Sequence, residues 1–438
     1  MSENKIWNST IECASEDYKK NLQSERLRDT VSRIYRNVEF YRKRMQEAGI
    51  LPEDIKTIDD IVKLPFTEKT DLRDNYPFGV FASPMSQIVR IHASSGTTGK
   101  PTVVGRTAKD LAIWSECVAR ALTMCGLDKN DIVQVGYGYG LFTGGLGLHY
   151  GVEKLGAAVI PASGGNTKKQ VQLIHDLGST ALACTPSYAL YIADAVKDAG
   201  FDSQKDLKLR VGIFGAEPWT EEMRSDIQKK LNITAHDIYG LSEVMGPGVA
   251  CDCQCQNGLH VCEDYFYPEI VNPETGEPLP HGQIGELVFT SLGVEGMPLI
   301  RYRTHDLCKI IPGKCSCGRT TIRISKLMGR CDDMLIIRGV NVFPSQVESV
   351  LLSMSETEPH YMLIVDRKGT LDTLTIQVEV QEQFFTDDMR GLQNLEKKIK
   401  ANIESVLAIS VNVQLVEPKS IPRCEGKAKR VIDNRKLV

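Results

Sequence analysis

A run of small, hydroxyl-bearing and basic residues has the composition of an anion-binding loop. The run consists of Ser94, Ser95, Gly96, Thr97, Thr98, Gly99, Lys100 and Pro101. Glycines let backbone N–H groups curl around an anion, hydroxyls add donors, and a lysine adds positive charge. It is not a Walker A motif, because only two residues separate its glycines and Pro101 stands where that motif needs serine or threonine. A flexible surface turn is the alternative interpretation.

The cysteines form a second group that could do chemistry, because eight of the 13 fall between Cys251 and Cys331. Structural zinc is held by four thiolate or imidazole ligands, and two close pairs of cysteines plus a histidine could supply them. The ligands that we predict are Cys253, His260, Cys315 and Cys317. The spacing is C-x-C rather than C-x₂-C, so scattered reduced thiols are the alternative.

The elements that must position these groups alternate between short apolar runs and helix-length segments from about residue 88 to 245. The runs are Ile132–Val135, Ala157–Pro161, Thr180–Cys184, Val211–Phe214 and Ala235–Tyr239. Apolar runs separated by helices are typical of buried parallel strands in a layered α/β domain. Ligands of open α/β sheets bind beyond the carboxyl ends of the strands, so we expect the site where these runs end.

The two ends of the chain have a different character. Residues 16–48 have helical spacing, with Leu27, Val31, Ile34, Tyr35 and Val38 on one face. After about residue 265 the sequence is richer in strand patterns, for example residues 285–290. Beyond residue 331 it predicts helices at 345–354 and after a cap at Thr386, and strands at 361–365, 374–380 and 411–416. We therefore expect an α/β fold with a large domain over residues 1–331, made of a layered parallel sheet and a β-rich subdomain, and a small α+β domain over residues 332–438.

Composition excludes several classes of protein. The chain has 438 residues, of which 42% are hydrophobic and 25% charged, and 52 basic against 56 acidic residues give a net charge of −4. Such a chain is neither a disordered tail nor a disulfide-stapled miniprotein, and it lacks the bulk positive charge that collects nucleic acid or anionic membrane. The uncharged stretch at residues 132–152 is interrupted by glycines, and the start lacks the layout of a secretion signal. We expect a soluble, cytoplasmic protein without nucleic-acid or membrane partners.

Five segments, in order along the chain, resemble the motifs of the adenylate-forming ligases, which include acyl- and aryl-CoA synthetases, luciferases and nonribosomal adenylation domains. They are Ser94–Pro101, Tyr239–Glu243, Tyr302–Asp306, Gly329–Asp333 and Gly426–Lys427. Within that superfamily the chain most resembles the phenylacetate–CoA ligase family. The segments that carry this likeness are Gly138–Gly145, Phe214–Pro218 and Arg338–Gln346.

The resemblance implies an ATP-dependent ligation of phenylacetate, or a close arylacetate, to coenzyme A through an acyl adenylate, with release of AMP and pyrophosphate. A carboxylate oxygen is a poor leaving group, whereas AMP leaves readily, and catalysis of such phosphoryl chemistry depends on positioning and charge neutralisation. One alternative is an adenylyltransferase that acts on another acid or cofactor without CoA transfer. Another is a catalytically silent, zinc-stabilised binding protein.

The resemblance also implies roles for individual residues. Ser95, Thr97, Thr98 and Lys100 would cradle the phosphates, Glu243 would bind Mg²⁺, and Asp306 would accept the ribose hydroxyls with Arg330 assisting. The other residues expected at the nucleotide are Ser94, Gly96, Gly99, Gly215, Ala216, Glu217, Pro218, Asp237, Ile238, Tyr239 and Ser242. The small 215–218 segment would pass under the adenine, and Tyr239 would stack on it. Ser242 stands where most relatives carry threonine, which keeps the hydroxyl.

Lys427 matches a mobile lysine that bridges carboxylate and α-phosphate oxygens during adenylation. The small domain that carries it would then rotate about Asp332 and present Gly339 and Val340 to the pantetheine of coenzyme A. Candidate walls of the acid pocket are Tyr137, Phe142 and Pro247, together with Ala216 and Ile238. A missing or extra methylene changes binding in an apolar pocket by only ~1–3 kcal/mol, so the sequence does not select one aryl acid. The resemblance further implies a homodimer.

Overall fold

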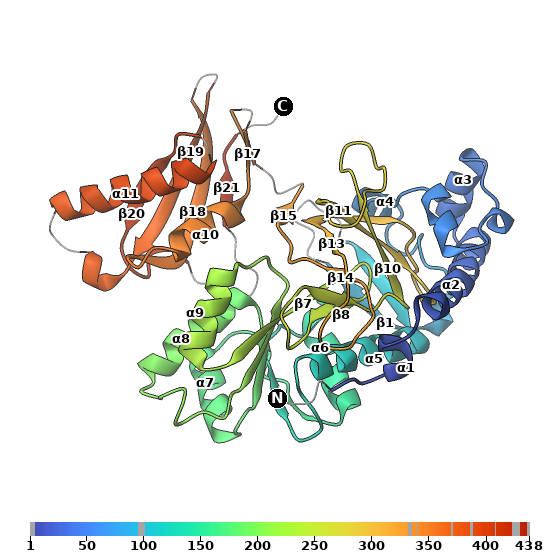
Figure 1. The fold of residues 1–438 in the computed structure, drawn as a ribbon, viewed down its shortest axis with the longest axis horizontal. Coiled ribbons are helices and arrows are strands. Elements are labelled where there is room, and N and C mark those ends of the chain that lie inside the picture. The colour runs from blue at the N-terminus through green and yellow to red at the C-terminus, as the bar shows by residue number, and fades with distance from the viewer. Residues whose placement is uncertain are drawn as a thin grey trace.

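The computed structural model describes residues 5–94, 101–331, 335–338, 340–368, 371–385, 389–407, 409–422 and 430–435. These ranges form a large lobe and a smaller C-terminal lobe (Figure 1). The smaller lobe, orange to red, lies beside helices α8 and α9 of the large lobe. The N-terminal helices, in blue, lie at the other side of the large lobe.

The described part of the large lobe is built around a nine-stranded sheet in the order β13-β14-β9-β8-β7-β6-β5-β3-β4. Its parallel strands are β3 (Ile132–Val135), β4 (Ala158–Ile160), β5 (Ala181–Cys184), β6 (Val211–Gly215) and β7 (Thr234–Leu241). The antiparallel strands are β8 (Gly246–Asp252), β9 (Leu259–Val261), β13 (Ile310–Ile311) and β14 (Arg323–Ile324). The five predicted parallel strands are confirmed. They are mostly apolar because the central strands are buried on both faces of the sheet, as the burial of β5 and β6 shows.

The helix before β3 and the helices that connect the parallel strands start at polar N-cap residues. They are α5 (Ala108–Met124), α6 (Gly144–Leu155), α7 (Thr167–Asp176), α8 (Pro186–Asp198) and α9 (Glu221–Leu231). The Thr107 hydroxyl accepts from Asp110 N at the start of α5, and Thr185 accepts from Tyr188 N at the start of α8. The glycine-interrupted stretch at residues 132–152 forms strand β3 and then, from Gly144, most of helix α6. No helix of the described residues is long and apolar enough to cross a membrane.

A second sheet lies against the first and supplies the predicted β-rich subdomain. It contains β10 (Phe266–Val271), β11 (Gly285–Ser291), β12 (Tyr302–Cys308) and β15 (Gly329–Arg330), in that order and all antiparallel. A separate hairpin of β1 (Ile88–Ala93) and β2 (Val103–Thr107) flanks the predicted anion-binding loop.

The N-terminal segment forms short and long helices: α1 (Ser9–Glu12), α2 (Glu16–Asn37), α3 (Glu39–Glu47) and α4 (Lys69–Asp74). The predicted helical spacing over residues 16–48 is confirmed, with a break between α2 and α3 at Val38. This residue is extended, with φ −119° and ψ 107°, and ends α2 while starting α3. Val38 is nevertheless buried, so its apolar spacing reflects packing rather than helix continuity.

The smaller lobe has a four-stranded sheet in the order β20-β19-β18-β21. Its elements are β16 (Leu335–Ile337), β17 (Val340–Val342), α10 (Pro344–Leu352), β18 (Thr357–Lys368), β19 (Leu371–Val380), α11 (Met389–Leu407), β20 (Asn412–Val416) and β21 (Val431–Asp433). The predicted helices and strands are confirmed, with α10 starting at Pro344 because proline suits the first helical turn. Ile399 and Ile403 of α11 pack on Ile376 and Val378 of the sheet. The predicted cap at Thr386 lies outside the described residues.

Candidate active site

A cavity of about 210 Å³ lies beyond the carboxyl ends of β6 and β7. Its described lining includes Ser94, Gly215, Ala216, Glu217, Pro218, Asp237, Ile238, Tyr239, Glu243, Asp306 and Arg330. All of these were singled out from the sequence as nucleotide-site candidates. The fold thus gathers predicted residues from five separate segments at the place where open α/β sheets bind ligands.

The end of β6 approaches its neighbouring strand too closely for any side chain. A Cβ on Gly215 would lie 2.0 Å from the carbonyl oxygen of Ile238, and Ala216 then adopts a left-handed φ of 72°. Glu217 Oε1 accepts a 2.7 Å hydrogen bond from Ser187 N in the first turn of α8. A carboxylate suits this helix start, where backbone N–H groups lack helical partners, and it fixes the 215–218 loop against the helix.

Two side chains hold the carboxylate of Asp306. Tyr239 donates to Oδ2 at 2.6 Å, and Arg330 Nη1 lies 3.3 Å from Oδ1. Asp306 and Arg330 face each other in the register of β12 and β15. Burial raises the pKa of Tyr239 well above its usual range, so the phenol remains a donor. One ring neighbour of Tyr239 is Phe289, stacked at 6.2 Å, and stacking on adenine stays a prediction.

Glu243 lies in the turn between β7 and β8, two residues beyond the end of β7. Its side chain is 6% exposed, and Oε1 lies 3.0 Å from Nζ of Lys69. Behind the turn, the buried Arg106 donates from Nη2 to the carbonyls of Ser242 and Glu243, at 2.8 and 3.3 Å. Burial lowers the pKa of Arg106 to about 10. A buried carboxylate that already attracts one cation suits a hard metal ion.

The sequence did not point to Lys69 or Arg106. Lys69 belongs to α4 and Arg106 to β2, and neither lies in a motif, so only tertiary contacts connect them with Glu243. A third missed cation is Lys326, which lines the same cavity, pairs with Glu221 at 2.8 Å and lies over the Trp219 ring at 4.3 Å. An isolated lysine or arginine forms no sequence pattern that would mark it as part of a site.

Asp237 is buried in the middle of β7 and lines the same cavity as Lys326. Burial raises the pKa of Asp237 to about 6, although the positive charge of Lys326 opposes the shift. The same burial lowers the pKa of Lys326. The cavity therefore contains a carboxyl group whose pKa of about 6 lies well above that of an ordinary aspartate.

A second, more apolar cavity of about 460 Å³ adjoins the first and shares Ser94, Ala216 and Ile238 with it. The predicted acid-pocket residues Tyr137, Phe142 and Pro247 line it, with Thr143, Thr185, Leu241, Ser242 and glycines. The hydroxyls of Thr143 and Ser242 are hydrogen-bonded to each other at 2.9 Å. Such a lining can take an aromatic ring whose polar end points to the first cavity.

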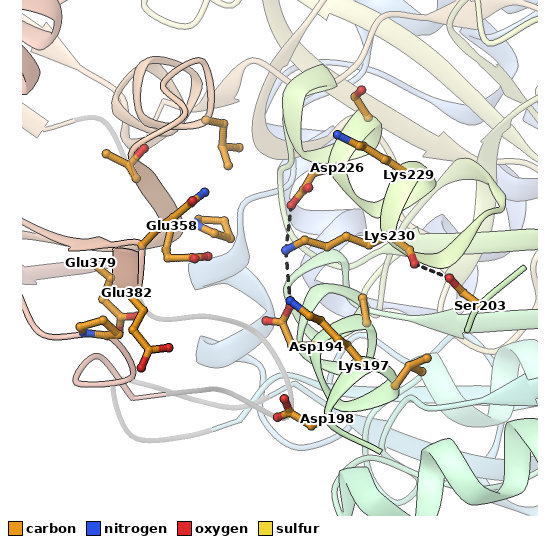
Figure 2. A pocket seen from close by; sticks show the side chains of 18 of the residues that line it. Asp194, Lys197, Asp198, Ser203, Asp226, Lys229, Lys230, Glu358, Glu379 and Glu382 are labelled. Carbon is orange, nitrogen blue, oxygen red and sulfur yellow. Dashed lines mark hydrogen bonds and ion pairs between the residues drawn. The ribbon is translucent and has the colours of Figure 1, made fainter. Parts of the chain in front are cut away.

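A larger cavity, about 940 Å³, lies elsewhere, between the two lobes. Figure 2 shows Lys230 between Asp194 and Asp226, at 3.4 and 3.3 Å, facing Glu358 of the small lobe. Glu379 and Glu382 lie on the same small-lobe side. None of the residues predicted for catalysis or nucleotide binding is among the described lining of this cavity. It is a charged gap between lobes.

The small lobe approaches the site through Arg430. Its Nη2 lies 3.5 Å from Ser187 Oγ and 3.6 Å from Glu348 Oε1, and its guanidinium lies 4.6 Å over the Tyr361 ring. Ser187 in turn donates to Glu217 of the nucleotide cavity. Arg430 follows Lys427 by three residues in the sequence. The predicted residues that lie outside the described ranges are Ser95, Gly96, Thr97, Thr98, Gly99, Lys100, Asp332, Gly339 and Lys427.

The four predicted zinc ligands come together in a buried cluster. The ligand atoms of Cys253, His260, Cys315 and Cys317 all lie within 4.8 Å of one another, so the cluster could hold a metal ion. Cys253 Sγ is 3.7 Å from Cys315 Sγ, and Cys317 Sγ is 3.4 Å from His260 Nε2. Thr321 Oγ1 contacts His260 Nδ1 at 2.8 Å, which orients the other ring nitrogen inward. Contacts with Cys253 and His260 lower the pKa of Cys317.

Comparison with known proteins agrees with this geometry. Residues 23–296 match the model of the AMP-binding enzyme family, and residues 339–435 match the AMP-binding enzyme C-terminal domain. Phenylacetate-coenzyme A ligase of Escherichia coli strain K12 is 51% identical over 98% of both chains. The Thermus thermophilus enzyme of the same name is 48% identical over 95% of this chain and 96% of its own.

Solved structures of a CoA ligase also resemble this chain over its whole length. A 2-hydroxyisobutyryl-CoA ligase in the postadenylation state, in complex with R3-HIB-AMP, matches with a TM-score of 0.93 and 27% identity. The same ligase with 2-HIB-AMP and CoA in the thioesterification state matches with a TM-score of 0.74 and 28% identity. Both comparisons cover 100% of this chain and 94% of that chain. The chain is a member of the AMP-binding enzyme family and, within it, belongs with the phenylacetate-coenzyme A ligases.

Proposed function

We propose that the chain ligates phenylacetate, or a close arylacetate, to coenzyme A through an acyl adenylate. The observation that carries the proposal is the junction of two cavities. The polar one gathers Asp306, Glu243 and the 215–218 loop, and it opens onto an apolar one lined by Tyr137 and Phe142. The identity of about half of the residues with phenylacetate-coenzyme A ligases supports an arylacetate as the acid.

The chemistry would run in two displacements. The acid's carboxylate attacks the α-phosphorus of ATP, and pyrophosphate leaves with the broken phosphoanhydride bond. The coenzyme A thiol then loses its proton and attacks the acyl carbon, and AMP leaves with the electron pair of the mixed anhydride. Binding both partners in adjoining cavities supplies most of the acceleration through orientation.

Each described residue has a position that fits its proposed role. Asp306, held by Tyr239 and Arg330, would accept the ribose hydroxyls, and Glu243 would hold the Mg²⁺ that accompanies ATP. Ser94 and the rest of its loop, with Lys100, would bind the phosphates. Lys427 would neutralise charge on the α-phosphate as the adenylate forms.

The proposed cycle also requires movement of the small domain, residues 332–438, against the large domain, residues 1–331, about Asp332. The two structures of 2-hydroxyisobutyryl-CoA ligase support this. They are the same protein at the same coverage, so TM-scores of 0.93 and 0.74 are consistent with two different arrangements of the lobes in that ligase. The higher TM-score supports an arrangement of the lobes of this chain like that of the postadenylation state. Rotation would bring Gly339 and Val340 to the pantetheine channel.

The Cys253 cluster would hold a structural zinc ion. The edges of a tetrahedral zinc site with Zn–S of about 2.3 Å and Zn–N of about 2.0 Å are about 3.5–3.8 Å, which the observed 3.7 and 3.4 Å approach. All four ligands are buried, as expected for a closed site. Leu259, which precedes His260, lines the nucleotide cavity, so the ion would stabilise that wall. We further propose a homodimer.

A panel of arylacetates, benzoates and short-chain acids, assayed for AMP production and pyrophosphate release with and without coenzyme A, tests the proposal. The expected result is CoA-dependent AMP formation that is fastest with phenylacetate or a near analogue. AMP transfer that does not depend on coenzyme A would instead identify an adenylyltransferase. No pyrophosphate release with any acid would contradict both and favour a binding protein.

A further inference from the structure

A second group of potential metal ligands lies outside the Cys253 cluster. The side chains of Glu286 on β11, His305 on β12 and Cys331 after β15 each offer one ligand atom, and these atoms lie within 4.8 Å of one another. We call these three residues the β-edge cluster. Glu286 is fully buried, whereas His305 has a side-chain exposure of 26% and Cys331 is half-buried, so solvent reaches the cluster from one side.

The distances within the β-edge cluster match the edges of a tetrahedral metal site. His305 Nδ1 lies 3.4 Å from Cys331 Sγ and 3.4 Å from Glu286 Oε1. Metal–nitrogen and metal–oxygen bonds of about 2.0–2.2 Å and a metal–sulfur bond of about 2.3 Å give ligand edges of about 3.4–3.6 Å. An ion could therefore enter with small shifts of the three side chains.

The imidazole is oriented as a metal ligand usually is. His305 Nε2, the nitrogen away from the cluster, lies 3.3 Å from Glu68 Oε2. A carboxylate that takes this N–H leaves Nδ1 as a lone-pair donor toward Cys331 and Glu286. His305 also has a left-handed φ of 62°, an uncommon conformation, and Glu286 Oε1 accepts its backbone N–H at 3.1 Å.

The charges of the described residues favour a divalent ion. Arg303 is the neighbouring cation, paired with Glu286 and, at 3.3 Å, with Glu68. With Cys331 as a thiolate, these three anions and one cation sum to −2. A divalent ion would neutralise that sum, and the proton of the thiol would leave to solvent. Nitrogen and sulfur ligands select a borderline transition metal over Mg²⁺ or Ca²⁺.

We propose that the β-edge cluster is a second metal site that binds Zn²⁺ or a similar transition-metal ion reversibly, with a fourth position open to water. Its position suggests an effect on catalysis, an extension that depends on the proposed function. Cys331 N donates to His305 O at 2.7 Å, and the adjacent residues Asp306 and Arg330 belong to the nucleotide cavity. Cys331 also precedes Asp332, the proposed hinge. A bound ion would fix the chain at the start of that hinge and slow rotation of the small domain.

Binding is tested without substrates, which separates it from the proposed function. Zinc-loaded protein is first dialysed to remove loosely bound metal and then titrated with Co²⁺, a spectroscopic probe for zinc sites. We expect one additional equivalent of Co²⁺ per chain, with thiolate-to-cobalt charge-transfer absorption, displaced by Zn²⁺. Cys331→Ser should abolish that absorption, and Glu68→Gln should weaken Co²⁺ binding by roughly 10–100-fold. Cys255→Ser, a half-buried cysteine elsewhere, is the matched control and should behave as wild type.

Two further measurements keep the result interpretable. Thermal unfolding of metal-free Cys331→Ser should match the wild type, which excludes a folding defect, and Zn²⁺ should slow alkylation of Cys331. Co²⁺ uptake that is unchanged by Cys331→Ser would overturn the site.

The effect on catalysis is tested once ligase activity has been measured. Zn²⁺ should then inhibit thioester formation at least tenfold more than adenylate formation in wild type but not in Cys331→Ser. Equal inhibition of both steps would overturn the hinge effect.

Discussion

The phenol of Tyr239 donates a 2.6 Å hydrogen bond to Oδ2 of Asp306, which joins strand β7 of the nine-stranded sheet to strand β12 of the smaller sheet. The nucleotide cavity lies at this seam, so its two walls come from different sheets. Arg330 holds the other carboxylate oxygen from β15. The carboxylate is therefore positioned before any ligand arrives, which lowers the cost of ordering it on binding.

Asp306→Asn should raise the KM for ATP by roughly 10–100-fold. The reason is that a hydrogen bond to a charged group contributes about 1.5–3 kcal/mol, and the amide cannot accept two hydroxyls in the same way. Tyr239→Phe is the graded control, because it keeps the ring and loses one hydrogen bond, and it should raise KM by less than about tenfold. Steady-state kinetics with varied ATP measures both. A wild-type KM in Asp306→Asn would remove this residue from the nucleotide site.

Asp237→Asn should stabilise the unliganded protein in a pH-dependent way. The folded pKa of Asp237 is raised to about 6 by burial, above the usual 3.8, so the native state binds more protons than the unfolded state between these values. Its ionisation destabilises the fold fully above pH 6 and not at all below about pH 4, by about 3 kcal/mol at most. Thermal midpoints of both proteins at about pH 5 and about pH 7.5 measure this. An equal gap at both pH values would refute the shift.

Much of the fold could be read from the sequence because its strands are buried on both faces. The runs at β5 and β6 contain no polar side chain and β3 contains only one, Gln134, so these strands could be identified without any periodic pattern. The break at Val38 could not be read, because a valine that packs into the core has the same spacing inside or between helices. Neither glycine nor proline marks that break.

The motif residues predicted the nucleotide cavity. The cations that contact Glu243 and its backbone could not be predicted from the sequence. Lys69 reaches Glu243 from α4, and Arg106 supports the 242–243 backbone from β2. Gly215 was expected to allow close approach of the adenine, yet its nearest constraint is the backbone of Ile238 in the adjacent strand. The sequence indicated that a small residue is needed at position 215, but it did not show that the group nearest to this residue is the Ile238 carbonyl.

Cys315→Ser should release the metal and destabilise the large lobe. Purified wild-type protein should contain about one zinc per chain, since structural sites are tight. Removing a ligand leaves three buried donors without their ion, and we expect the thermal midpoint to fall by roughly 5 °C or more. Cys255→Ser, next to the cluster but not among its ligands, is the control. Less than ~0.3 zinc per chain in wild type would rule out a structural zinc site.

Lys230→Ala should loosen the observed arrangement of the lobes. Lys230 lies between Asp194 and Asp226 and faces Glu358 across the gap in Figure 2, so its loss leaves carboxylates of both lobes facing each other. Partly exposed ion pairs contribute about 0–1 kcal/mol, so the population should shift by up to about fivefold. Energy transfer between fluorophores on the two lobes reports the change. Lys229→Ala, in the same cavity, should leave it unaltered, and an equal shift in both variants would refute a specific role.

The most direct test of the central claim compares the two half-reactions in Lys427→Ala. The account predicts that the rate of adenylate formation, measured as acid-dependent pyrophosphate release, falls by at least about a thousandfold. The reason is that the variant lacks a group that neutralises charge in the transition state. Thioester formation from supplied phenylacetyl adenylate and coenzyme A should stay within a few-fold of wild type. An equal loss in both half-reactions would contradict the account.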